Sequence, residues 1–317
     1  MDFGEIDKKI LTCLYHNSRE SLSKIGKACG VSREQVEYRI RKFEVGKIIK
    51  KYLTVFNYGL LGLNEFVVVW LKVKSKKDYI KKELTKIPNM ISVGEVLNGF
   101  DLYVDFVFKD KIFFERTFNE FLSKYGELVL DYDIFISTFV EIYHLKSFGK
   151  KSPEVSYSLI DESLKIDLTE KDLKILSIID SNGRISALEI SNSVGMTAEG
   201  VAYCLNKLRK KGVIVGTRIL FDMEKAGFYF AGLRLNLKNV SGPTRQKVIS
   251  FCRSHKNVNA LSFGIGKYNS FIQFLYQSEE ELRGAISDFK RSFGDLILNS
   301  ELLMTEKEEH IRMLPLE

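Results

Sequence analysis

Two short stretches of the sequence carry side chains of the kind that bind DNA. They are VSREQVEYRIRKF (31–43) and MTAEGVAYCLNKL (196–208), and each follows a glycine. In the first stretch, apolar residues at helical spacing share one face, and the rest of the surface is polar. The polar residues are Ser32, Arg33, Glu34, Gln35, Tyr38, Arg39, Arg41 and Lys42, of which Arg33 and Arg39 border the apolar face. Arg and Gln pair with base edges in a major groove, and Arg, Lys, Ser and Tyr commonly hold phosphates.

Three further cations, Lys47, Lys50 and Lys51, follow the first stretch. Residues 1–58 contain 12 Lys and Arg against 7 Asp and Glu, a net charge of +5. This excess, on a segment that resembles a DNA-reading helix and its flank, predicts a surface for a polyanion. The alternative is a solvated basic face that binds nothing.

The second stretch is less charged. Its outward face is formed by Glu199, Tyr203, Asn206 and Lys207, and Cys204 stands where the first stretch has Arg39. Residues 168–222 contain 8 Lys and Arg against 6 Asp and Glu, a net charge of +2. We expect this copy to hold the DNA backbone through Lys207, Lys210, Lys211 and Arg218. The alternative is a helix kept for packing or for subunit contact.

No other set of residues in the sequence points to catalysis or metal binding. The four cysteines form no C-x-x-C pair, and the four histidines are isolated. The glycine pattern FGIGKYN (263–269) lacks the third glycine of a dinucleotide loop and favours a hairpin. The sequence therefore predicts no catalytic residue, no cofactor and no metal site.

A repeat organises the chain. IDKKILTCLYHNSRESLSKIGKACGVS (6–32) aligns with KDLKILSIIDSNGRISALEISNSVGMT (171–197) at an offset of 165. FLSKYGELVLDYDI (121–134) aligns with FKRSFGDLILNSEL (289–302) at an offset of 168. The chain is therefore expected to hold two copies of one module, each with two small domains.

Each copy begins with the pattern of a helix-turn-helix. Ser21 and Ser186 are expected to cap a second helix, which Gly30 and Gly195 end. Ser32 and Thr197 then cap a third helix, which is the DNA-reading stretch described above. The β-rich segments KIIKKYLTVFN (47–57) and VIVGTRILFD (213–222) follow, as the wing of a winged helix-turn-helix would.

The rest of each copy predicts the order β-α-β-β-α-β of a ferredoxin-like domain. Asn98-Gly99 is a strong hairpin signal between the second and third strands of the first copy. The predicted fold class is α+β, and the predicted domains are 1–60, 61–145, 168–226 and 227–317, with 146–167 as a linker.

Composition agrees with a globular protein. Of 317 residues, 45% are hydrophobic and 28% charged, and the net charge is +7. The N-terminus has no apolar core of a signal peptide, and the longest apolar run, FVVVWL (66–71), is too short to cross a bilayer. We expect a cytoplasmic protein that is not membrane-bound.

A winged helix-turn-helix followed by this β-α-β-β-α-β domain resembles the Lrp/AsnC (feast/famine) family of prokaryotic transcription regulators. The resemblance covers nearly the whole chain twice, apart from the linker. It implies that Ser32, Arg33, Glu34, Gln35, Tyr38, Arg39 and Lys42 read operator DNA. It also implies that the second domain, often called RAM, pairs subunits through its sheet, so a homo-oligomer is expected.

The resemblance further implies a site for a small effector, commonly an amino acid, near the hairpin turn of each RAM domain. These turns are Asn98, Gly99, Phe100 and Asp101 in the first copy and Gly266, Lys267, Tyr268 and Asn269 in the second. The tandem arrangement departs from most of the family, whose chains hold one module.

Two other functions are weighed against a DNA-binding regulator. Siroheme decarboxylases share this layout, but they usually carry His and Arg beside the hairpin, and neither NGFDLYVDF nor GKYNSFIQF contains them. An effector-binding scaffold without DNA contact is the other alternative. We expect a regulator rather than an enzyme, with double-stranded DNA bound chiefly by the first module at an asymmetric operator. We also expect the two RAM sheets to pair about a two-fold axis, either within one chain or between chains.

Overall fold

The computed structural model of the chain describes residues 4–146, 156–160, 166–240, 242–310 and 312–315. These residues form two compact units, each built from both halves of the chain. The first unit comprises Met1–Asn57, His144–Tyr157 and Asp167–Phe228, and the second comprises Tyr58–Tyr143, Ser158–Ile166 and Tyr229–Glu317. Most of the predicted linker, 146–167, lies outside the described residues.

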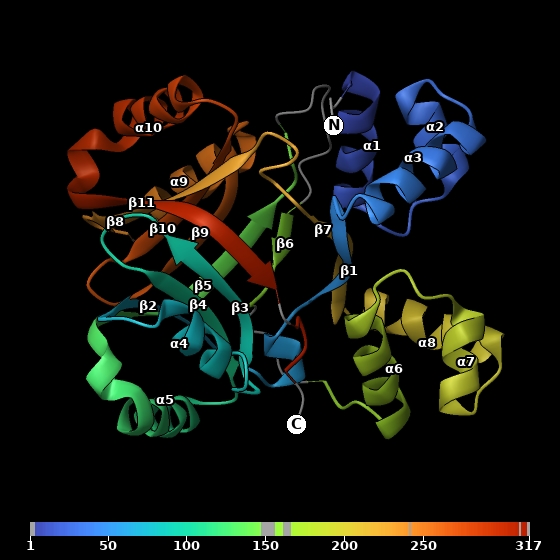
Figure 1. The fold of residues 1–317 in the computed structure, drawn as a ribbon, viewed down its shortest axis with the longest axis horizontal. Helices are drawn as coiled ribbons and strands as arrows, with labels where there is room; N and C mark the ends of the chain where they lie inside the picture. Colours follow the sequence, from blue (N-terminus) through green and yellow to red (C-terminus); the bar gives the residue numbers. More distant parts are fainter. Residues whose placement is uncertain (1–3, 147–155, 161–165, 241, 311, 316–317) are drawn as a thin grey trace. The chain divides into compact units, whose positions relative to one another are not determined.

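The first unit, which we call the helix-turn-helix pair, contains two copies of three helices and a strand (Figure 1). The first copy consists of α1 (Glu5–His16), α2 (Leu22–Cys29), α3 (Arg33–Val45) and β1 (Ile49–Phe56). The second consists of α6 (Glu170–Ser181), α7 (Ala187–Val194), α8 (Ala198–Lys210) and β7 (Ile214–Phe221).

The predicted caps of these helices are present. Ser21 and Ser186 accept hydrogen bonds from the backbone at the starts of α2 and α7. Gly30 and Gly195 end these helices in the left-handed conformation, at φ 73° and 63°, which a glycine adopts without a steric penalty. The turn of each helix-turn-helix is thus fixed by local sequence.

The predicted wing strands pair in a way that the sequence did not indicate. β1 forms a two-stranded antiparallel sheet with β7 of the other copy, and Figure 1 shows α3 near one end of this ribbon and α8 near the other. Thr54 lies opposite Thr217, and Leu53 lies opposite Arg218. Leu53 and Arg218 are equivalent positions in the repeat, so the ribbon has a quasi-two-fold axis.

The second unit contains two β-α-β-β-α-β domains, which confirms the predicted class and order. The first domain consists of β2 (Glu65–Val73), α4 (Lys77–Leu84), β3 (Met90–Val96), β4 (Leu102–Phe108), α5 (Lys111–Tyr125) and β5 (Val129–Tyr143). The second consists of β8 (Tyr229–Leu237), α9 (Gly242–Ser254), β9 (Val258–Ile265), β10 (Ser270–Tyr276), α10 (Glu279–Phe293) and β11 (Ile297–His310). Short 3-10 helices at Gly59–Leu61, Gly126–Leu128 and Gly294–Leu296 and the strand β6 (Ser156–Ser158), beside β5, complete the elements.

Eight strands of the second unit close into a ring. Their order is β2-β4-β3-β11-β8-β10-β9-β5, and β5 pairs again with β2. We call this the strand ring; its two seams between domains are β3–β11 and β5–β9. The expected pairing of the two RAM sheets therefore occurs within one chain.

Separate hydrophobic cores lie on the two sides of these sheets. The helices of each domain cover the outer face of its own strands, as Figure 1 shows. A smaller core fills the inside of the strand ring, where Trp70, Val96, Phe135 and Leu303 are buried.

Candidate nucleic-acid interface

The outward face of α3 is accessible and basic. Arg33, Glu34, Gln35, Tyr38, Arg41 and Lys42 are exposed, whereas Val36, Ile40 and Phe43 are buried. Tyr38 is 70% exposed, and burial offers no reason for an aromatic side chain at that position. This face has the composition expected of a DNA-reading surface.

Two of the predicted DNA-reading residues also build the start of α3. Ser32 Oγ accepts from the Gln35 backbone N at 3.2 Å, and Gln35 Oε1 accepts from the Ser32 backbone N at 2.9 Å. This reciprocal pair is a capping box. Because Gln35 Oε1 is used in this cap, the amide nitrogen of Gln35 is the group that can donate to a base.

Arg39 has a different environment from the other predicted readers. Its guanidinium lies 2.5 Å from Asp7 on α1, and the Asp7 side chain is 16% exposed. Arg39 therefore fixes α3 against α1, and it reaches DNA only by giving up this ion pair. In the second copy Lys207 of α8 pairs with Asp172 of α6 at 3.2 Å, so the contact is conserved between the copies although Cys204 replaces Arg39.

The cations that follow α3 are only partly available. Lys47 is exposed and adopts φ 52°. Lys50 pairs with Asp222 of the second copy at 3.5 Å, and Lys51 is half-buried. Of these three predicted phosphate ligands, Lys47 is thus the most accessible.

Arg218, which was predicted to hold phosphate, is buried within the first unit. Arg218 is 7% exposed, donates to Tyr15 Oη at 3.1 Å and lies 5.4 Å from the centre of the Tyr15 ring. It lies on β7, whose pairing with β1 places it against α1. Lys210 and Lys211 remain exposed at the end of α8.

Equivalent hydrogen bonds hold the helix-turn-helix pair together. The Ser18 backbone N donates to Thr217 O at 3.2 Å, and its repeat equivalent, the Gly183 backbone N, donates to Tyr52 O at 2.8 Å. Gly183 lies so close to β1 that an added Cβ would come within 2.8 Å of Leu53 backbone atoms. The turn before each second helix therefore docks on the strand of the other copy.

Arg19 joins the two copies through hydrogen bonds that its repeat equivalent does not form. It donates to Gly183 O at 2.6 Å and to Ile185 O at 2.7 Å. Its repeat equivalent, Arg184, instead lies over the Tyr52 ring at 5.4 Å and donates to Tyr52 Oη at 3.4 Å. Both arginines lie in the repeated segments, but the sequence alone assigns them no role because it does not show the pairing of β1 with β7.

The predicted effector turns lie at the seams of the strand ring. Asn98 is bonded to β11, with Nδ2 donating to Leu302 O at 2.7 Å and Oδ1 accepting from Met304 N at 2.8 Å. On the other seam, an added Cβ at Gly266 would lie 2.6 Å from Ile134 O of β5. Asn98, Gly99, Gly266 and Lys267 are exposed.

Asp101 and Asn269 perform the same structural task in the two copies. Asp101 Oδ2 accepts from Val73 N at 2.8 Å, and Asn269 Oδ1 accepts from Leu237 N at 2.9 Å. Asn269 Nδ2 also donates to Leu237 O at 2.8 Å. The exchange of aspartate for asparagine thus preserves the bond that joins each turn to the first strand of its domain.

The other two turn residues face a buried arginine that the sequence analysis missed. Arg234 on β8 is 1% exposed, and its guanidinium lies 4.5 Å from the Tyr268 ring centre and 5.4 Å from that of Phe100. It forms ion pairs with Asp133 and, at 3.1 Å, with Glu301. The sequence feature that could have revealed Arg234 is a single charged residue within the otherwise apolar strand FAGLRLNL.

The centre of the strand ring is occupied by Arg234 and its partners. Aromatic rings pack against Arg234 on several sides, and its one positive charge faces two carboxylates. Within the described ranges, no group of three or more His, Cys, Asp or Glu side chains is placed to hold a metal ion.

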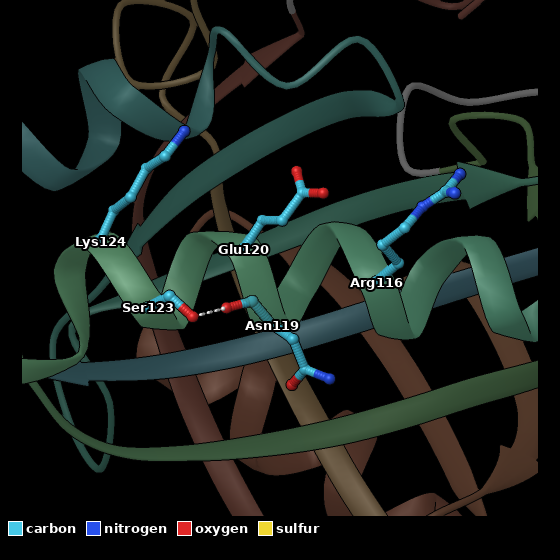
Figure 2. A pocket seen from close by; sticks show the side chains of 5 residues that line it. All are labelled: Arg116, Asn119, Glu120, Ser123 and Lys124. Carbon is cyan, nitrogen blue, oxygen red and sulfur yellow. Dashed lines mark hydrogen bonds between the residues drawn. The ribbon is translucent and has the colours of Figure 1, made fainter.

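A hollow beside α5 is lined by Arg116, Asn119, Glu120, Ser123 and Lys124 (Figure 2). All five residues belong to one exposed helix face, and Ser123 Oγ donates to Asn119 O of the same helix at 2.8 Å. Their charges alternate in sign and do not converge on a common point. We assign no function to this hollow. Among the residues that the structure describes, no helix has the length and apolar character needed to span a membrane.

Comparisons with known families agree with this architecture. A family model described as the AsnC-type helix-turn-helix domain matches residues 4–44, and one described as winged helix-turn-helix DNA-binding matches residues 168–215. The HTH-type transcriptional regulator FL11 of Pyrococcus horikoshii is 29% identical over 125 residues, which are 39% of this chain and 80% of that protein. Regulatory protein AsnC of Haemophilus influenzae is 25% identical over 144 residues, 44% of this chain and 93% of that protein. The AsnC-type model match and these relatives support an Lrp/AsnC family regulator.

A solved structure matches the chain over both modules. The siroheme decarboxylase NirDL has a TM-score of 0.60 at 17% identity, and the match covers 96% of this chain and 92% of that one. At that identity the likeness shows a shared fold and carries no statement about activity. The tandem arrangement of two such modules in one chain therefore has a structural precedent.

Proposed function

We propose that this Lrp/AsnC chain is a transcriptional regulator that binds double-stranded DNA through the helix-turn-helix pair, with α3 as the base-reading helix. The observation that carries the proposal is the β1–β7 ribbon, which relates α3 and α8 by a quasi-two-fold axis within one chain. Pairs of recognition helices related by a two-fold axis meet successive half-sites of a DNA duplex. The names of the relatives, which are transcriptional regulators, support the same function.

The two helices differ in what they offer to DNA. Arg33 and Arg41 on α3 are exposed; Arg41 contacts Glu37 at 3.3 Å in an exposed pair that is worth little. On α8 the corresponding positions are Ala198 and Asn206, and the cations gather at its end, at Lys210 and Lys211. The operator is therefore asymmetric, with specific contacts to α3 and backbone contacts to α8.

Selection of a binding site from random DNA, followed by footprinting, tests this function. We expect protection of one half-site to disappear in the variant Arg33→Ala with Arg41→Ala. The matched control, Lys210→Ala with Lys211→Ala, should weaken binding to all sequences about equally and leave the preferred sequence unchanged. Strong sequence-specific protection that survives in the α3 variant would mean that α8 reads bases.

We also propose that the protein binds a small effector, such as an amino acid. Its site is the exposed part of the turns, at Asn98, Gly99, Gly266 and Lys267. These turns bond across the seams, so a ligand there would act on the contact between the two RAM domains. Thermal shift measurements with single amino acids test this, and Lys267→Ala should reduce any shift. Further association into homo-oligomers and a cytoplasmic location stay predictions.

A further inference from the structure

Two cysteines of the first helix-turn-helix lie in direct contact. Cys13 on α1 and Cys29 at the end of α2 have their Sγ atoms 4.0 Å apart. Cys29 is 7% exposed, and Cys13 is half-buried. The sulfurs of a disulfide are about 2.05 Å apart, so a bond requires the two atoms to approach by about 2 Å.

The fold itself does not require thiols at these positions. The repeat equivalents of Cys13 and Cys29 are Ile178 on α6 and Val194 on α7, which carry no thiol.

We propose that Cys13 and Cys29 form an oxidation site, in which a peroxide converts the two thiols into a disulfide that links α1 to α2. The sulfur of Cys13, as thiolate, attacks one peroxide oxygen. The O–O bond breaks, one water leaves after protonation, and Cys13 becomes a sulfenic acid. The sulfur of Cys29 then attacks Cys13 Sγ, the S–S bond forms, the S–O bond breaks and a second water leaves. Two thiols and hydrogen peroxide thus yield one disulfide and two waters.

The surroundings assign the first step to Cys13. A hydrogen bond from the Cys29 thiol lowers the pKa of Cys13, although burial acts in the opposite direction. Donation of that bond and burial raise the pKa of Cys29. The more acidic thiol is also the more accessible one, which is the arrangement of a thiol that reacts with peroxide.

The disulfide would change the position of α3 through contacts that are already present. Gly26 of α2 touches the turn before α3 so closely that an added Cβ would lie 2.7 Å from Val31 O. The ion pair of Asp7 with Arg39 joins α1 to α3. Drawing α2 toward α1 therefore displaces α3. This consequence rests on the proposed DNA binding, whereas the oxidation itself does not.

The experiment uses the full chain with Cys204→Ser and Cys252→Ser, which keeps only the two thiols in question. Hydrogen peroxide should remove two hydrogen atoms from the intact mass and reduce the free thiols from two per chain to none, and dithiothreitol should restore both. The matched control is Cys13→Ile with Cys29→Val, the residues of the second copy. In that control, the same treatment should leave the mass unchanged.

Two results would overturn the site: thiols that persist or add oxygen instead of pairing, or a disulfide that joins two chains on a non-reducing gel. With DNA, we expect oxidation to reduce affinity at least about tenfold, reversibly, and only when both cysteines are present. A disulfide that forms without this loss would refute the coupling to α3. If neither redox form binds DNA, the proposed function fails, and the mass and thiol counts still decide the oxidation site.

Discussion

Trp70 and Arg234 occupy the same position in the two repeats and meet inside the strand ring. Trp70 is the sixth residue of β2 and Arg234 the sixth of β8, and the guanidinium lies 4.2 Å from the centre of the Trp70 ring. Asp133 and Glu301, which both pair with Arg234, are likewise equivalent positions, at the offset of 168. One copy thus supplies the cation and the other the aromatic face. The quasi-two-fold symmetry of the two domains is therefore lost at the centre of the strand ring.

Removal of this arginine should destabilise the strand ring. Arg234→Met leaves Asp133 and Glu301 without their cation, and breaking such a buried ion pair costs about 3 kcal/mol. Trp70 is the one tryptophan of the chain, so its fluorescence during urea unfolding reports on this unit. We expect the unfolding midpoint to fall.

A triple variant separates charge from packing. Arg234→Met combined with Asp133→Asn and Glu301→Gln should recover most of the lost stability, because no carboxylate then remains uncompensated. If Arg234→Met alone is as stable as the wild type, the ion pairs do not hold the two domains together.

Arg19 and Arg184 provide a matched test of the helix-turn-helix pair. Arg19→Ala deprives two carbonyl oxygens of a charged donor, at a cost of about 2 kcal/mol. Amides of the β1–β7 ribbon should then exchange with deuterium about thirtyfold faster. Arg184→Ala removes only a long hydrogen bond and a ring contact, and its effect should be several times smaller. Equal effects would contradict the assignment of Arg19 as the main clamp.

The salt dependence of DNA binding should distinguish the cations of the helix-turn-helix pair. Each phosphate contact removed, such as that of Lys210 or Lys211, should reduce the slope of log affinity against log salt by ~0.9. Arg218→Ala should leave the slope unchanged, because Arg218 is buried against Tyr15. A reduced slope in the Arg218 variant would show that this side chain leaves its site on binding.

The stability of the first unit should decrease below neutral pH because of two stacked histidines. His144 lies against His16 with ring centres 4.1 Å apart, and it is 4% exposed. Burial, and then the neighbouring His16, Arg218 and Lys146, lower the pKa of His144 to about 3. Its usual value is 6.5, so the unfolded chain takes up a proton that the folded chain excludes between pH 6.5 and 3.

The folded state is therefore favoured fully above pH 6.5, and this contribution is lost as the pH falls toward 3. His144→Phe should flatten the dependence of the melting temperature on pH in this range. His255→Gln, which changes a histidine just after α9 that lies beside Asp288, serves as the control and should leave the contribution of His144 in place. Parallel curves for wild type and His144→Phe would contradict the prediction.

Much of the fold followed from local sequence. The caps at Ser21, Ser32 and Thr197 and the glycine turns depend on neighbouring residues alone, so the repeat was enough to place both helix-turn-helix motifs. The strands at β1 and β7 were also expected. Their partners were not, because alternation along a strand shows which side is buried but not which strand lies beside it.

The environments of Arg218 and Arg234 were not predicted for the same reason as the strand pairing. Arg218 was expected to hold phosphate because it follows a basic helix, yet the pairing of β7 with β1 buries it. Arg234 went unnoticed because its partners, Trp70 and Asp133, lie more than 100 positions away in the sequence. Both environments are set by contacts between segments that lie far apart in the sequence.

The closure of the strand ring within one chain has a consequence for cells that hold several proteins of this kind. The β3–β11 and β5–β9 seams are already paired, so these strand edges are not open to a foreign subunit. Fusion also makes the pairing independent of protein concentration. Single-module paralogues that exchange subunits through such edges can form mixed dimers, whereas this chain is insulated from that exchange, and its two halves are free to diverge.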